Sequence, residues 1–563
     1  MKRFRKKTAF PTIDPDEVFL DSRNLPLFDT QQFEGQLERP IAKHVLYLFI
    51  GVFLLVWLIF LGKIFNLQIN QGQNFAERSE RNTLRRASLP PQRGVIYDRR
   101  GVELAWNDPE RTYRAEPGIG SVVGYLGFPG ETNPDSANLD PRELVGRDGA
   151  ERVFNEILHG QTGIRIEEVN VNNEVQTEYL LRPPRDGENI TLSIDARLQE
   201  KLYNIIKSLA EERGFSGGAA VLLDVKTGEL YALVSYPEYD SNVITRGDDR
   251  EAITRFLTDP QKPFLNRAVA GLYTPGSIVK PIIAIGALNE GVIDPATEIL
   301  STGALTLPNP FFPDQSSIFR DWKAHGLVNI RRALAVSSDV YFYEIGGGFE
   351  NQKGLGINNI DKYARLFGLG ESTGINWPSE EIGNIPTPDW KAKTFPDDPA
   401  WRIGNTYHTA IGQYGFQVTP LQMARMVGAI ATDGALVTPT VLAASTTPIH
   451  QPARDLNSLI SPGFFQIVRE GMRLAVTEGT AQRLNISKVA IAAKTGTAEL
   501  GASKTNVNSW VIGFFPYEAP RYAFAVVMER VSSGDTVRAA LIIRQLIDWL
   551  SENAPEYFMT NDF

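Results

Sequence analysis

The chain has 563 residues, of which 42% are hydrophobic and 22% charged, and it therefore exceeds the size of one domain. Its composition excludes a disordered, collagen-like or fully membrane-embedded protein. A net charge of −9, with no dense basic stripe beyond the N-terminus, argues against nucleic acid as a partner, and the lack of cysteine excludes disulfides and thiol catalysis.

The first predicted element is a transmembrane signal anchor over residues 45–66. Val45 to Gly62 runs eighteen residues without a charge, at the lower end of the length that crosses a bilayer, so a buried core helix is disfavoured. No small-residue cleavage site follows, and the basic cluster KRFRKK favours a cytoplasmic tail over residues 1–44. We therefore expect a single crossing of the cytoplasmic (inner) membrane, with the rest of the chain on the extracytoplasmic, periplasmic side.

Two further domains are predicted after the anchor. Residues 67–190 alternate Pro-, Gly- and Arg-rich segments with short β-like runs, which predicts an elongated, β-rich pedestal. A helical pattern over residues 193–214 opens a second domain, residues 191–563. Strand-like runs flank a turn at residues 226–228 and recur before an apolar helix at the C-terminus. This order predicts an α+β domain, an antiparallel sheet covered by helices.

The first candidate catalytic residue is Ser277, in the segment GLYTPGSIVKP. Proline is tolerated only near the start of a helix, so Pro281 predicts a helix beginning at about residues 275–277. Ser277 then lies at the positive end of the helix dipole, with Lys280 one turn further on the same face. Burial would favour a neutral Lys280 that acts as base for a Ser277 nucleophile. The spacing alone is weak, since an N-cap serine beside a solvated lysine has the same pattern.

Two further patterns follow in order. The segment LAVSSDVYFY contains Ser337 and Asp339, and an apolar strand ends in a run of four residues: Lys494, Thr495, Gly496 and Thr497. Ser337 can relay a proton between Lys280 and a leaving amine, and Asp339 can hydrogen-bond a lysine or a substrate amide. The three patterns together are the set of the penicillin-recognising serine acyl-transferases.

The last pattern predicts substrate binding. Lys494 offers a positive charge for a carboxylate, the two threonines offer hydroxyls, and Gly496 would let an edge strand approach a ligand backbone closely. We expect the backbone N–H groups of Ser277 and Thr497 to form the oxyanion hole.

On these motifs, the sequence resembles the class B penicillin-binding proteins of the elongation type (penicillin-binding protein 2). The resemblance covers most of the chain after residue 44, including PPQRGVIYDRRGVELAWN and FLNRAVAGLYTPGSIVKP. It implies a penicillin-binding/serine β-lactamase-like domain and a D,D-transpeptidase that cross-links peptidoglycan stem peptides in cell-wall elongation. It also implies a SEDS-family glycosyltransferase partner, inhibition by β-lactams and no cofactor. The chain departs from the family pattern at Ala493 and Tyr414, where glycine is usual.

The resemblance also raises a metal site, because some relatives bind zinc in the corresponding segment with Asp, His and Cys. Asp321 and His325 remain candidate ligands here, but Ser338 stands at the cysteine position, and a hydroxyl is a poor replacement for a thiolate. A hydrogen-bonded Asp–His pair is therefore favoured, and no metal is expected.

Other functions stay open from the residues. A D,D-carboxypeptidase or β-lactamase would use the same serine with water as the acceptor. A non-catalytic penicillin sensor would need an effector that a 44-residue tail cannot house, and an inactive scaffold should have lost Ser277, Lys280 or Lys494.

Overall fold

The computed structural model describes residues 43–129, 143–170, 172, 174–309, 312, 314–443, 453–501, 505–533 and 539–558. The chain divides into two compact units: Met1–Arg86 with Ile166–Tyr179, and Ala87–Arg165 with Leu180–Phe563. Except for its last two residues, the tail predicted over residues 1–44 lies outside the described residues.

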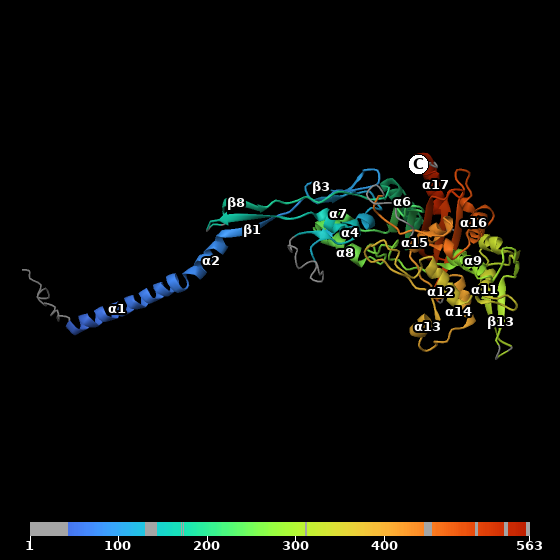
Figure 1. The fold of residues 1–563 in the computed structure, drawn as a ribbon, viewed down its shortest axis with the longest axis horizontal. Helices are drawn as coiled ribbons and strands as arrows, with labels where there is room; N and C mark the ends of the chain where they lie inside the picture. Colours follow the sequence, from blue (N-terminus) through green and yellow to red (C-terminus); the bar gives the residue numbers. More distant parts are fainter. Residues whose placement is uncertain are drawn as a thin grey trace, which may run out of the picture. The chain divides into compact units, whose positions relative to one another are not determined.

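The first unit begins with the predicted apolar helix. Helix α1 (Lys43–Phe65) continues as a π-helical turn, η3 (Asn66–Asn70), and α2 (Gly72–Thr83) follows (Figure 1). The helical run Lys43–Asn70 spans 28 residues, is apolar enough to cross a membrane, and buries none of its most apolar stretch within the protein. A helix that is hydrophobic on all sides needs an apolar environment, and lipid supplies one. The helix therefore fits a membrane anchor.

Three strands form a separate small sheet in the order β1-β7-β8, with bounds Leu84–Leu89, Gly163–Val169 and Val175–Arg182. Every residue of β8 is exposed, although the strand carries Tyr179, Leu180 and Leu181.

The N-terminal part of the second unit is a four-stranded sheet in the order β4-β3-β2-β9 with short helices. Its core holds a buried carboxylate, Glu151, which accepts hydrogen bonds from Arg93 at 2.6 Å and from Arg111 at 2.7 Å. A buried charge is tolerated only when it is paired, so these contacts tie the helix that carries Glu151 to the sheet. The elements are β2 (Ile96–Tyr97), β3 (Glu103–Asn107), β4 (Arg111–Tyr113), α3 (Gly120–Val123), β5 (Leu126–Gly127), β6 (Val145–Gly146), α4 (Gly149–Val153), α5 (Asn155–His159) and β9 (Ile190–Thr191).

The remainder of the second unit is organised around a five-stranded antiparallel sheet in the order β11-β10-β20-β19-β18. Both predicted hairpins are present, β10 with β11 and β19 with β20. The strands span Gly217–Asp224 (β10), Leu230–Tyr236 (β11), Ala492–Leu500 (β18), Asn506–Phe515 (β19) and Tyr522–Ser532 (β20). Strand β18 is an edge strand.

Helices cover both faces of this sheet, which makes its central strands almost continuously apolar. Alternate residues of β19 enter two different cores: Val511 packs with α6 (Ala196–Arg213) and α17 (Ala540–Asn553), and Ile512 with α9 (Lys280–Asn289) and α15 (Pro420–Ala431). In Figure 1, α6 and α17 lie together beside the sheet. The predicted helix over residues 193–214 is α6, capped by Asp195 and ended by Gly214 in a left-handed conformation.

The other elements of this part are α7 (Ser241–Arg246), α8 (Arg250–Thr258), η5 (Gly276–Val279), β12 (Ile299–Ser301), β13 (Ala304–Pro308), β14 (Ser316–Arg320), β15 (Gly326–Val328), α10 (Ile330–Val336), α11 (Asp339–Gly347), α12 (Ile357–Leu366), α13 (Pro388–Thr394), α14 (Ile403–Ala410), β16 (Ala435–Leu436), β17 (Arg454–Asp455), η6 (Leu456–Ser458), α16 (Pro462–Thr477), η7 (Gln482–Leu484) and η8 (Pro555–Tyr557). With the sheet, they form the expected α+β fold.

Candidate active site

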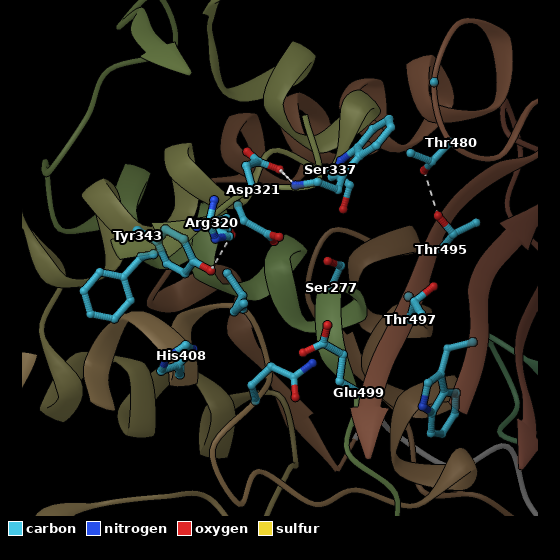
Figure 2. Close-up of a pocket in the computed structure, with 18 of the residues that line it drawn as sticks. Ser277, Arg320, Asp321, Ser337, Tyr343, His408, Thr480, Thr495, Thr497 and Glu499 are labelled. Atoms are coloured by element: carbon cyan, nitrogen blue, oxygen red, sulfur yellow. Dashed lines mark hydrogen bonds between the residues drawn. The ribbon is translucent and has the colours of Figure 1, made fainter. Parts of the chain in front are cut away.

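Ser277 lies at the start of a buried helix, as predicted. It belongs to the 3-10 turn η5, which runs directly into α9, and Pro281 occupies the first turn of α9. The Ser277 side chain is half-buried and faces the cleft (Figure 2). Lys280, three residues later, is completely buried. A helix tolerates proline in its first turn, because the N–H group that proline lacks would have no partner in the helix there.

Ser337 and Asp339 are placed by the two-residue connection, Ser337 and Ser338, between α10 and α11. Ser337 ends α10 in the left-handed conformation, with φ of 61°, and Ser338 is the N-cap of α11. A non-glycine residue in this conformation is strained, and such strain is common at functional sites. The tight connection places the Ser337 hydroxyl and the Asp339 carboxylate beside the Lys280 ammonium.

Lys280 is held by the second motif. Its Nζ lies 2.6 Å from Asp339 Oδ1, 2.9 Å from the Ser337 carbonyl oxygen and 3.4 Å from Ser337 Oγ. Within the described residues, no hydrogen bond joins Lys280 to Ser277. The expected contact of Asp339 with a lysine is therefore present.

Lys494 approaches the same serine from the edge strand β18. Its Nζ donates a hydrogen bond of 2.8 Å to Ser337 Oγ. Burial, together with the charge of Lys280, lowers the pKa of Lys494 well below its usual value. The Ser337 hydroxyl thus stands between two buried lysines.

Gly496 leaves room for the turn that carries Ser277. A Cβ atom at this position would lie 2.9 Å from the Pro275 carbonyl oxygen and from Ile278 Cγ2. The space where that Cβ would lie is filled by Pro275 and η5, and Gly496 also lines the cleft in which the sequence predicts a close approach to a ligand. The absence of a side chain lets β18 pack directly on the turn that carries Ser277.

A cleft of about 1130 Å³ joins these groups. Ser277, Ser337, Asp339, Thr495, Gly496 and Thr497 all line it. Lys280 and Lys494 lie beneath its floor, fully buried. All eight predicted site residues therefore gather in one place, although they come from three separate segments of the chain.

The cleft also contains residues that the motifs did not identify. They are Arg320, Tyr343, His408, Thr480, Arg483 and Glu499, five of which are labelled in Figure 2. Thr495 Oγ1 donates a 2.7 Å hydrogen bond to Thr480 Oγ1, which orients the Thr495 hydroxyl. Strand alternation could have found Glu499, because residues 495, 497 and 499 face the same side of β18. The others come from distant segments and carry no local signal.

Tyr414 occupies another wall of the cleft. It has a left-handed backbone, with φ of 62°, which explains why glycine suits the same position in relatives. Its ring packs edge-on against Trp390 at 5.9 Å and Trp401 at 5.8 Å between ring centroids. These contacts pack the Tyr414 ring, which lines the cleft, against two tryptophans.

The candidate metal ligands form a buried pair beside the cleft, which Asp321 lines. The side chains of Asp321 and His325 are 0% and 2% exposed, and His325 Nε2 lies 3.6 Å from Asp321 Oδ1. This separation is too long for a hydrogen bond. Asp321 and His325 therefore lie within ion-pair distance, but the expected hydrogen bond between them is not formed. In the part of the chain that the structure describes, no group of three or more His, Cys, Asp or Glu side chains is arranged to hold a metal.

A serine beside two lysines, at the edge of an α+β sheet, is the site of a penicillin-recognising acyl-transferase. The family described as penicillin binding protein transpeptidase domain matches residues 218–548, and the penicillin-binding protein dimerisation domain matches residues 107–192. The chain belongs to this family of penicillin-binding transpeptidases, in the class B branch of penicillin-binding protein 2. The expected family and fold class are confirmed.

Three relatives illustrate the similarity. The peptidoglycan D,D-transpeptidase MrdA of Escherichia coli (strain K12) is 29% identical over 617 residues, covering 90% of this chain and 94% of MrdA. The crystal structure of Pseudomonas aeruginosa PBP2 in complex with WCK 5153 is 32% identical, with a TM-score of 0.69, and covers 83% of this chain and 97% of that chain. A chain in a peptidoglycan synthase complex, described as coordinating polymerization and crosslinking, is 26% identical, with a TM-score of 0.70. The match covers 90% of this chain and 97% of that chain.

Proposed function

We propose that this protein, a serine D,D-transpeptidase of peptidoglycan synthesis, forms its acyl-enzyme on Ser277. The hydroxyl oxygen attacks the carbonyl carbon of the penultimate D-Ala, and the bond to the terminal D-Ala breaks. The amine of a neighbouring strand then attacks the ester, which forms the cross-link and frees Ser277. The single observation that carries this assignment is the convergence of Ser277, Ser337 and two buried lysines on one cleft.

The two lysines suggest how the base becomes available. Lys280 forms an ion pair with Asp339 and cannot accept the Ser277 proton while it is charged. A substrate carboxylate beside Lys494 would favour the charged form of that lysine. One proton could then pass from Lys280 through the Ser337 hydroxyl to Lys494, over contacts of 3.4 Å and 2.8 Å. Lys280, now neutral, takes the Ser277 proton, and Ser337 relays it to the leaving amine.

The remaining groups bind and polarise the substrate. The backbone N–H groups of Ser277 and Thr497 are the proposed oxyanion donors, since Gly496 lets β18 pack tightly beside η5. The Thr495 and Thr497 side chains face the cleft and supply hydroxyls for the substrate carboxylate and backbone. No cofactor takes part in these steps.

Mass spectrometry of the full-length protein after incubation with labelled penicillin tests the nucleophile. A single adduct on Ser277, lost in Ser277→Ala, is expected, and undiminished labelling of that variant would refute the assignment. Product analysis with peptidoglycan strands separates the reactions. Cross-linked product identifies transpeptidation, whereas free acid alone would show a carboxypeptidase or β-lactamase.

The protein is membrane-anchored, and its orientation and partner are part of the proposal. We place α1 as a single span with the catalytic unit on the periplasmic side of the inner membrane, because the basic cluster KRFRKK precedes the helix. We further propose that residues 67–190 act as a pedestal that binds a SEDS-family glycosyltransferase. The similarity to a chain of a peptidoglycan synthase complex supports this partner. Residues 191–563 are the proposed transpeptidase domain.

A further inference from the structure

A buried carboxylate holds the connection that carries Ser337 and Asp339. Asp321 follows β14, and its Oδ2 accepts hydrogen bonds from Ser338 Oγ at 2.9 Å and from the backbone N–H of Val340 at 3.0 Å. Ser301 Oγ donates to the same oxygen at 3.3 Å. Oδ1 accepts from the Trp322 backbone N–H at 2.8 Å. Both oxygens of Asp321 are therefore occupied by donors of the protein itself.

These residues do not fit a zinc ion. Zinc is held by three or four N, S or O ligands, and the cysteine position of zinc-binding relatives is Ser338. The Ser338 hydroxyl is a neutral group that bonds to Asp321 and, at 2.9 Å, to Ser301 Oγ. His325 Nε2 is buried without a hydrogen-bond partner. Asp321 and His325 are therefore the two side chains here that could serve as strong zinc ligands. Two strong ligands and a neutral hydroxyl are too few for a stable zinc site.

We infer that Asp321 is a positioning residue for acyl transfer, which acts through its hydrogen bonds to Ser338 and Val340. Ser338 lies between Ser337 and Asp339, and its side chain is completely buried. By binding Ser338 and Val340 together, Asp321 fixes the residues on both sides of Asp339. The strained backbone of Ser337 needs such a restraint to persist.

The consequence for the reaction follows from the contacts of the connection. Ser337 contacts both lysines, and Asp339 contacts Lys280. A shift of about 1 Å in such a group can lower a rate about 100-fold. Asp321 lines the cleft, and its hydrogen bonds go to the α10–α11 connection and its neighbours and not to Lys280 or Lys494, so it acts through the position of Ser337 and Asp339. The inference rests on the acylation proposed for Ser277.

The test measures acylation of the full-length protein by labelled penicillin, separating the dissociation constant of the initial complex from the acylation rate constant. Asp321→Ala is expected to lower the rate constant about 100-fold with little change in the dissociation constant. Asp321→Asn keeps an acceptor oxygen for Ser338 and Val340 and should restore most of the rate. Asp361→Ala, on the distant helix α12, is the matched control and should acylate normally. A folded Asp321→Ala variant that acylates within about threefold of the unmodified protein would overturn the inference.

A second variant decides the matter if Asp321→Ala fails to melt cooperatively. Ser338→Ala removes one donor and leaves the carboxylate in place, so a loss of about tenfold in the rate constant is expected, and an unchanged rate would overturn the inference. Elemental analysis after incubation with zinc should find no stoichiometric metal, and a chelator should leave acylation unchanged. One zinc per chain with chelator-sensitive acylation would assign the role to a metal instead. Labelling that persists in Ser277→Ala would refute the proposed nucleophile. This outcome is distinct from the outcomes for the Asp321 and Ser338 variants and for zinc.

Discussion

The Ser337 hydroxyl accepts a 2.8 Å hydrogen bond from Lys494, a residue 157 positions further along the chain. The same hydroxyl lies 3.4 Å from the Lys280 ammonium. A hydroxyl can donate one proton and accept others, so Ser337 is able to pass a proton between two lysines that do not touch. This contact joins the second and third motifs in the structure.

Replacement of Lys280 by alanine should lower the rate of penicillin acylation at least about 100-fold, the lower end for a lost general base. The second-order rate constant of acylation checks this. Lys362→Ala removes an exposed lysine of α12 and serves as the control. A change smaller than about tenfold in a normally melting Lys280→Ala protein would show that Lys280 is not the base.

The stability of the protein should depend on Lys494 at alkaline pH. The pKa of Lys494 is lowered in the folded state, whereas the unfolded chain keeps the usual value of 10.5. Between these two values the unfolded chain binds a proton that the folded chain lacks, so the free energy of unfolding rises with pH in that window. Lys494→Met should remove this rise.

Melting temperatures of the two proteins between neutral pH and about pH 10.5 measure this effect. The exposed Lys362→Met variant is the control and should follow the unmodified protein. Identical pH profiles for Lys494→Met and the unmodified protein would mean that Lys494 keeps its full charge when folded.

Gly496→Ala should disturb the contact between β18 and the turn that carries Ser277. The added Cβ would meet the Pro275 carbonyl oxygen and Ile278 at 2.9 Å, and backbone cannot easily give way. We expect a loss of about 1–3 kcal/mol in stability and a loss of about tenfold or more in acylation. Gly463→Ala, where the nearest atom is Ser461 Oγ at 3.8 Å, is the control. Normal acylation by Gly496→Ala would show that this packing does not position Ser277.

The pedestal prediction concerns two exposed arginines of β1. Reversing their charge, in Arg85→Glu with Arg86→Glu, should leave penicillin labelling unchanged, because neither lines the cleft. If the pedestal binds a glycosyltransferase, the same change should abolish stimulation of glycan polymerisation in a reconstituted pair. A scan of pedestal surface residues that leaves polymerisation unaffected would make the module a spacer.

The sequence by itself predicted several of the elements and the candidate reactive groups. The uncharged run from Val45 predicted α1, Pro281 located the start of the Ser277 helix, and the hairpins followed from turn residues between apolar runs. These features depend on local properties, namely hydrophobic length, the missing N–H of proline and turn chemistry, so they can be read without the fold.

Only the tertiary structure decided how these groups are arranged. That Lys280 pairs with Asp339, that Lys494 reaches Ser337, and that Gly496 faces Pro275 are contacts between distant segments, set by the packing of β18, η5 and the α10–α11 connection. The hydrogen bonds around Asp321 are also contacts between distant segments of the chain. They form because β14 ends beside the N-terminus of α11, and side-chain identity alone does not say which buried donors a carboxylate will meet.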